Sequence, residues 1–129
     1  MREIKYQGWT GKELLGVVRL HFDADGAIWW SPFYDQHRLY NAEHNPMRQY
    51  TGLKDKNGQE IYEGDIVRYG GFKKYQPVVV EWHEAICGFL PFADYEDQNG
   101  FPDMLSQQQY VVIGNKWENP ERLKEVNNG

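Results

Sequence analysis

Four histidines and one cysteine are the side chains of this sequence that zinc and related metals prefer as ligands: His21, His37, His44, His83 and Cys87. His83 and Cys87 are four residues apart, a spacing that places two side chains on one face of a helix but not of a strand. The surrounding residues have the pattern of a strand, and no second close pair completes a four-ligand set. We therefore predict no metal site.

Two aspartate-containing segments, residues 23–26 (DADG) and 55–58 (DKNG), resemble the start of a calcium-binding loop. Such a loop has its glycine at the sixth position and a bidentate glutamate at the twelfth, whereas here glycine comes fourth. Glycine at that position is typical of a tight turn between two strands. The two segments therefore predict hairpin turns.

Catalytic side chains have no recognisable motif around them. Ser31 and Ser106 are the only serines, neither lies in a Gly-x-Ser-x-Gly motif, and Cys87 has no cysteine-protease motif. Glu63 and Asp65 flank a glycine, which is typical of a turn. No glycine-rich loop with a following helix is present to hold a phosphate cofactor. We predict a protein that is not an enzyme, with no catalytic residues and no cofactor.

Trp29 and Trp30 are adjacent on a predicted strand, so their side chains point to opposite faces. One can lie in the core, and the other then lies at the surface or in an interface unless a second layer covers both faces. Residues 91–110 contain no Lys or Arg but several acids, and they predict a surface excursion. The candidate protein-binding residues are Trp29, Trp30, Asp94, Glu96 and Asp97.

A basic and aromatic patch in residues 68–75 favours the alternative hypothesis, a nucleic-acid-binding protein. Its residues are Arg68, Phe72, Lys73, Lys74 and Tyr75. Small β-barrels bind single strands by stacking bases on aromatic rings, with basic side chains on the phosphates. The net charge of −5 counts against this alternative. A solvated hairpin tip, with lysines that keep strand edges from aggregating, also explains the pattern.

The elements that must position these residues are strands, because apolar residues repeat with a period of two. Val18, Leu20 and Phe22 share one face of an extended segment. Asn119 and Pro120 predict a short C-terminal helix. The fold class is therefore mainly β, in one small domain over residues 1–129. Further predicted strands lie in residues 27–31, 49–53, 66–69, 77–83, 88–92 and 110–113.

Composition supports a folded, soluble chain. Of 129 residues, 40% are hydrophobic and 16% aromatic, which is enough for a core. No apolar run approaches the ~20 residues that span a bilayer, and the N-terminus lacks the apolar region of a signal peptide. One cysteine cannot form an internal disulfide. We expect an intracellular protein with an unidentified protein partner or a second copy of itself as its ligand, and no membrane contact.

Four blocks of the sequence resemble the YopX family, small proteins encoded mainly by phages and prophages of bacteria. They are residues 1–6 (MREIKY) with Trp9, 49–67 (QYTGLKDKNGQEIYEGDIV), 112–115 (VIGN) and 118–121 (ENPE). The resemblance implies a β-rich fold with a partly open, SH3-like barrel and a location in the cytoplasm of a bacterial host. It implies no activity and no catalytic residue, because the family has no established function.

Overall fold

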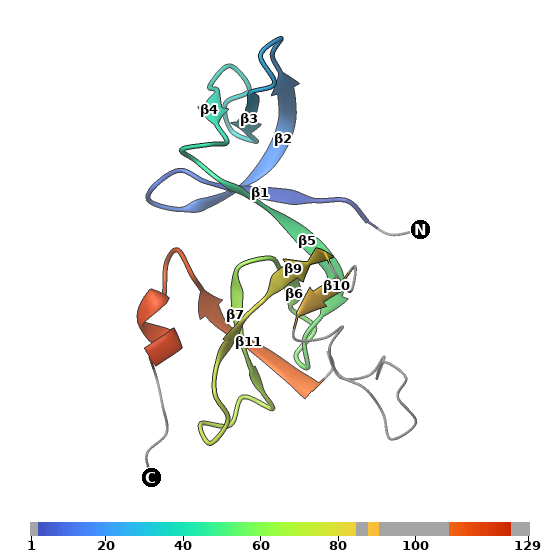
Figure 1. Cartoon of the computed structure of the whole chain (residues 1–129), viewed down its shortest axis with the longest axis vertical. Helices are drawn as coiled ribbons and strands as arrows, with labels where there is room; N and C mark the ends of the chain where they lie inside the picture. Colours follow the sequence, from blue (N-terminus) through green and yellow to red (C-terminus); the bar gives the residue numbers. More distant parts are fainter. Residues whose placement is uncertain (1–2, 85–87, 91–108, 125–129) are drawn as a thin grey trace. The chain divides into compact units, whose positions relative to one another are not determined.

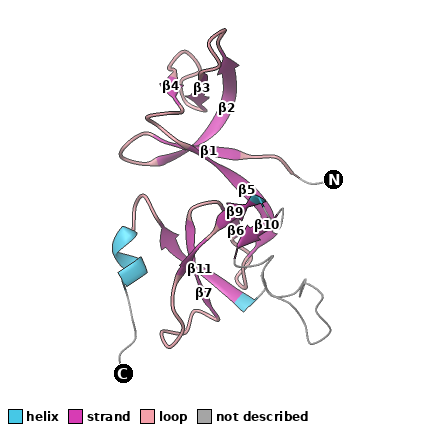
Figure 2. Ribbon diagram, viewed as in Figure 1, coloured by secondary structure: helices cyan, strands magenta, loops and turns pink. Residues whose placement is uncertain are grey.

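The computed structural model describes residues 3–84, 88–90 and 109–124 of the chain (Figure 1). Strands account for most of the regular structure in these residues (Figure 2). The prediction of a mainly β protein is confirmed. The chain divides into two compact units, residues 1–50 and 51–129.

The first unit contains four antiparallel strands and the start of a fifth: β1 (Tyr6–Trp9), β2 (Leu14–Phe22), β3 (Ile28–Pro32), β4 (Tyr40–Asn41) and β5 (Met47–Lys54). The strand order is β4-β3-β2-β1-β5-β6, so β5 carries the chain from the first unit into the second. The predicted turn at residues 23–26 joins β2 to β3. Gly26 has a φ of 84°, and the Asp25 N–H donates to Asp23 Oδ1 over 2.9 Å.

Trp30 forms the centre of the first unit. Its ring is fully buried, stacks on Tyr40 with 4.5 Å between ring centroids, and donates from Nε1 to the Asn45 carbonyl over 2.8 Å. The ring lies directly over Gly8 of β1, where a Cβ atom would be only 2.2 Å from Trp30 Cζ2. A side chain at position 8 would therefore occupy the space that the indole fills.

The second unit contains short strands in open sheets: β6 (Glu60–Tyr62), β7 (Asp65–Tyr69), β8 (Val78–Val79), β9 (Glu81–His83), β10 (Gly88–Leu90) and β11 (Tyr110–Asn115). The order β11-β7-β8 makes one sheet and β10-β9 another. The described strands do not close into a barrel. The buried core of this unit is formed by Ile61, Val67, Val80 and Phe89.

The predicted turn at residues 55–58 links β5 to β6 and is fixed by a buried carboxylate. Asp55 Oδ1 accepts from the N–H groups of Asn57 (2.8 Å) and Gln59 (2.9 Å). Its Oδ2 accepts from the N–H of Val112 in β11, also over 2.9 Å. Asp55 thus holds its own turn and ties that turn to a strand 57 residues away in sequence. The segment is a hairpin turn, as its glycine position predicts.

The predicted C-terminal helix is a single 3-10 turn, η3 (Pro120–Lys124). Asn119 accepts from the Asn115 N–H through Oδ1 over 3.2 Å, and its carbonyl accepts from the Arg122 N–H over 3.0 Å. No helix in the described residues is long and apolar enough to cross a membrane.

Candidate interaction surfaces

Within residues 3–84, 88–90 and 109–124, no three His, Cys, Asp or Glu side chains lie together as a metal site requires. Cys87 lies outside the described residues.

An open surface pocket of about 520 Å³ lies beside the turn at residues 55–58. Its lining includes Lys54, Lys56 and Asp55, and Asp55 is the one carboxylate among the described lining residues. That carboxylate already accepts three backbone N–H groups, so it is held as a structural acceptor. Among the described lining residues there is therefore no second carboxylate with which Asp55 could share acid–base work.

The two tryptophans lie on opposite faces of β3, with Trp29 opposite His21 and Trp30 opposite Leu20 in β2. Trp30 is the core residue and is not available as a binding residue. Trp29 is half-buried and donates from Nε1 to Asp23 Oδ2 over 3.2 Å. The Asp25 N–H, and after it the Trp29 indole N–H, lower the pKa of Asp23 below its ordinary value. Trp29 therefore closes the β2–β3 turn and presents only part of its ring to solvent.

Asp94, Glu96 and Asp97, the other candidate protein-binding residues, lie outside the described residues.

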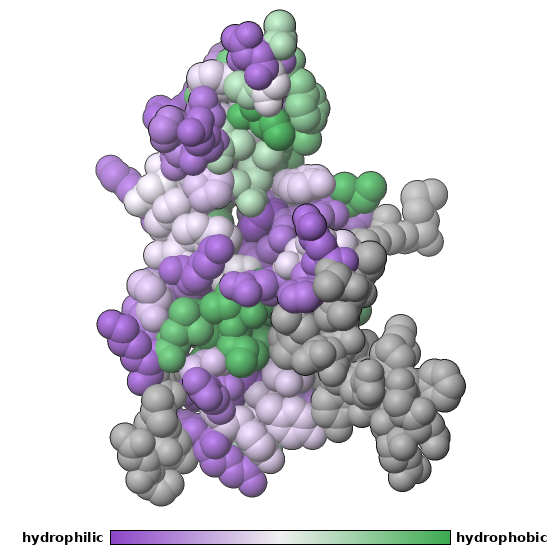
Figure 3. All heavy atoms as spheres, in the orientation of Figure 1, coloured by the Kyte–Doolittle hydropathy of each residue, from purple (hydrophilic) through white to green (hydrophobic). Residues whose placement is uncertain are grey.

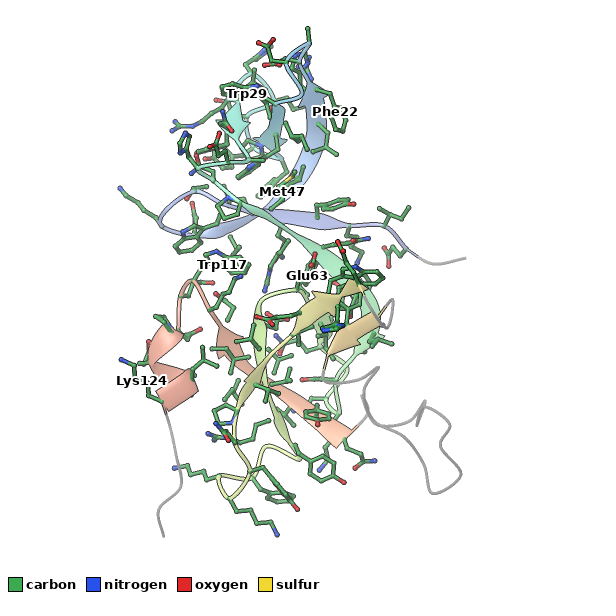
Figure 4. All side chains as sticks on the ribbon, in the orientation of Figure 1. Phe22, Trp29, Met47, Glu63, Trp117 and Lys124 are labelled. Carbon is green, nitrogen blue, oxygen red and sulfur yellow. The ribbon has the colours of Figure 1, made fainter. Side chains whose placement is uncertain are left out.

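An exposed apolar surface of the first unit belongs to β2. Val18, Leu20 and Phe22 are 52%, 39% and 66% exposed, and we call these three residues the β2 strip. Figure 3 shows apolar atoms gathered along the β2 side of this unit, and in Figure 4 the Phe22 side chain projects outward from the strand. The sequence predicted that these side chains share a face. The register against β3 agrees for Leu20 and Phe22, which lie opposite Trp30 and Ile28, whereas Val18 lies at a register shift between Val17 and Arg19.

The β2 strip lies beyond the residues of β2 that pair with β1. β1 pairs with β2 only at residues 14–16, whereas β3 pairs with β2 as far as Phe22. Apolar side chains gathered on one strand face are characteristic of an interaction site more than of an ordinary surface. The sequence alternation could not indicate whether this face was buried or open, since both give the same pattern.

A second surface lies at the β7–β8 hairpin of the other unit. Tyr69, Phe72 and Tyr75 are exposed there, and the rings of Tyr69 and Tyr75 meet edge to face at 5.0 Å. Lys74 Nζ lies 5.1 Å from the centroid of Tyr75. Lys56, from the turn at residues 55–58, places its Nζ 5.8 Å from the centroid of Phe72. We call Lys56, Tyr69, Phe72, Lys73, Lys74 and Tyr75 the hairpin cluster.

Arg68 does not belong to the hairpin cluster. It is only 4% exposed within β7, opposite Val111 of β11, so its guanidinium is not presented to a ligand in solution. The sequence placed Arg68 in the patch because it is close along the chain. It missed Lys56, which reaches the same surface only because the turn at residues 55–58 is hydrogen-bonded to β11: the Lys56 N–H donates to the Tyr110 carbonyl over 2.9 Å.

The model of one protein family, described as YopX protein, matches residues 5–124 of the chain. The chain belongs to the YopX family. The resemblance seen in the sequence is confirmed, and the match extends through both compact units.

Two solved structures of YopX-like chains have the same fold. A crystal structure of a protein from Enterococcus faecalis is 30% identical with a TM-score of 0.65, covering 95% of this chain and 99% of that one. The crystal structure of YopX from Bacillus subtilis is 19% identical with a TM-score of 0.56 and the same coverages. No curated protein matches the chain. The YopX comparisons therefore establish family and fold, and function must be argued from the surfaces above.

Proposed function

We propose that this YopX-family protein is a non-enzymatic protein-interaction module that binds its partner through the β2 strip. The observation that carries the proposal is the exposure of Val18, Leu20 and Phe22 within five residues of one strand, with Leu20 and Phe22 on one face. Burial of an exposed Val, Leu or Phe side chain stabilises a complex by ~1.5–3 kcal/mol at most. Three partly exposed side chains can therefore supply much of the free energy of a moderate interface.

We place this activity in the cytoplasm of a bacterial host, as a phage or prophage accessory protein with an SH3-like arrangement of strands. The family resemblance supports this setting, and both structural relatives come from bacteria. The single cysteine agrees with a reducing compartment.

Replacing Phe22 with serine tests the protein-interaction proposal. We expect Phe22→Ser to reduce retention of the partner by about tenfold or more, as truncation of an aromatic anchor does. Stability should change by less than about 0.5 kcal/mol, because the ring is already largely in water. The measurement is a quantitative pull-down from the bacterial host after nuclease treatment, together with thermal melting of each variant.

Phe33→Ser is the matched control, because Phe33 is the same residue type in the same unit and is 62% exposed. Phe33 directly follows Pro32, the last residue of β3. Phe22 pairs with Ile28, which is at the other end of that strand. Equal loss of the partner in both variants would contradict the proposal, since it would show a general response to surface hydrophobicity.

A second candidate function is binding of single-stranded nucleic acid. It is favoured by the position of Lys56 Nζ beside the Phe72 ring. Exposed rings with cations alongside are the arrangement that stacks bases and neutralises phosphates. Three lysines predict a slope of log K against log salt of roughly −2, which is about fifteenfold weaker binding between 50 and 200 mM salt.

The test of this second function is fluorescence anisotropy of a labelled oligothymidylate titrated with the protein at several salt concentrations. The paired variant Lys73→Glu/Lys74→Glu should abolish binding. Lys12→Glu/Lys116→Glu makes the same change in net charge at lysines that do not belong to the hairpin cluster, and it should leave most of the affinity. Affinity that does not change with salt concentration would exclude the hairpin cluster as a nucleic-acid site. Equal weakening of binding by both double variants would exclude it as well.

A further inference from the structure

Residues 18–22 of β2 form an open sheet edge as well as an apolar face. On one side this segment pairs with β3, from Arg19 opposite Ser31 to Phe22 opposite Ile28. On the other side, β1 pairs only with residues 14–16, and no described strand pairs with residues 18–22. A strand edge with unpaired peptide groups is a template on which another extended segment can add.

The hydrogen-bond phase shows which peptide groups face this edge. The Asp23 N–H donates to the Ala27 carbonyl over 3.0 Å, which makes these two residues a hydrogen-bonded pair. In an antiparallel ladder such pairs alternate with non-bonded pairs, so Phe22 and Leu20 direct their N–H and C=O groups away from β3. The Ile28 carbonyl agrees with this phase, because it accepts from Ala42 at β4 over 2.8 Å instead of from β2.

The side chains of this edge alternate in chemistry. Leu20 and Phe22 share the apolar face, next to the exposed Val18 at the register shift, while Arg19 and His21, both exposed, point to the other face. A strand added beside β2 places its own side chains level with these on both faces. Apolar residues on the added strand would therefore continue the β2 strip, and acidic residues between them would meet Arg19 and the imidazole of His21.

We infer that the partner of the β2 strip is an extended peptide segment in which apolar residues alternate with acidic ones, and that it adds to the open edge of β2 as a new strand. This inference rests on the proposed function and names the chemistry of the partner. Backbone hydrogen bonds at Leu20 and Phe22 provide the register, and the alternating side chains provide the specificity.

A second copy of the chain fits this edge less well than an acidic strand does. Antiparallel pairing of β2 with itself about Leu20 places Arg19 opposite the His21 of the other copy, so the Arg19 guanidinium meets no carboxylate there. Opposite charges directly across two strands stabilise the pairing, and like charges destabilise it. The charge pattern of the edge therefore selects a different, acidic partner strand.

The experiment uses the full chain and two fluorescein-labelled peptides, Glu-Val-Glu-Ile-Glu-Val-Glu and the same peptide with lysine in place of glutamate. We expect the acidic peptide to bind at least tenfold more tightly than the basic one, measured by anisotropy. Arg19→Glu should reverse this preference. A peptide with proline in place of the central isoleucine should not bind, because proline removes a ladder N–H.

Amide hydrogen exchange distinguishes strand addition from contact with the β2 face alone. In the free protein the Leu20 and Phe22 amides face the open edge, and the acidic peptide should slow their exchange by tenfold or more. Peptide binding without this protection would overturn strand addition, as would equal affinity for both peptides. Protection that rises with protein concentration alone, with a dimer in sedimentation, would identify a second copy as the occupant.

Failure of this inference is separable from failure of the proposed function. If neither peptide binds while Phe22→Ser still releases the partner and Phe33→Ser retains it, the protein-interaction module stands and strand addition is wrong. If neither peptide binds and both variants retain the partner, both proposals are wrong.

Discussion

Replacing Gly8 with alanine should destabilise the protein by about 3 kcal/mol or more, and lower its melting temperature by about 10 °C or more. The added Cβ would lie 2.2–2.4 Å from three atoms of the Trp30 ring. That ring is fully buried, stacked on Tyr40 and hydrogen-bonded to the Asn45 carbonyl, so it cannot move aside without losing these contacts. Urea denaturation followed by tryptophan fluorescence measures the effect.

Gly16→Ala is the matched control for Gly8→Ala. Gly16 lies in β2 opposite Gln7, and a Cβ there meets no atom within 4 Å, so its replacement should be neutral or slightly stabilising. A double-mutant cycle with Trp30→Phe adds a sharper criterion. Trp30→Phe should lower the free energy of unfolding by less in the Gly8→Ala variant than in the native protein. Strictly additive effects would contradict the close approach of Gly8 and Trp30.

Removing the Asp55 carboxylate should cost about 3–5 kcal/mol, among the larger losses from a single substitution. Asp55→Ala leaves three backbone N–H groups without their acceptor, including the Val112 N–H of β11. The free energy of unfolding of Asp55→Asn should lie between those of the native protein and Asp55→Ala. The amide retains one acceptor oxygen, but its NH₂ group would face an N–H donor. Chemical denaturation gives the free energy of unfolding for each variant.

Asp23→Ala is the informative comparison for Asp55→Ala. Asp23 occupies the same position in the turn at residues 23–26 and accepts the local Asp25 N–H, but its other partner is a side chain only six residues away. Asp23→Ala should therefore lower the free energy of unfolding distinctly less than Asp55→Ala does. Equal losses would show that the local turn, and not the connection to β11, accounts for the stabilising effect of Asp55.

Local features of the fold were predictable from the sequence because they depend on neighbouring residues. The glycines at positions 26 and 58 have the positive φ that their turns require. The alternation along β2 placed Val18, Leu20 and Phe22 on one face, and the adjacent tryptophans were assigned opposite faces. Each of these follows from the geometry of a few consecutive residues.

The candidate sites depended on longer-range contacts and were predicted less completely. Adjacency alone could not decide which tryptophan enters the core, since that choice depends on Gly8 leaving room for the Trp30 ring. Arg68 was grouped with the surface lysines because the chain places it near them, yet it is buried in β7, a strand paired with both β8 and β11. Lys56 was missed because hydrogen bonds to β11 bring it to the hairpin.

By itself, the sequence determined the family, the mainly β class, the turns and the faces of the strands, because these follow from residue type and short-range spacing. Only the tertiary structure decided which of those faces and edges stay open. The open edge beside the β2 strip depends on where β1 ends, and the burial of Arg68 and the position of Lys56 depend on the pairing of residues far apart in the chain. An alternating strand has the same sequence pattern whether its apolar side meets a core, a partner or water, so burial is a property of the assembled sheet.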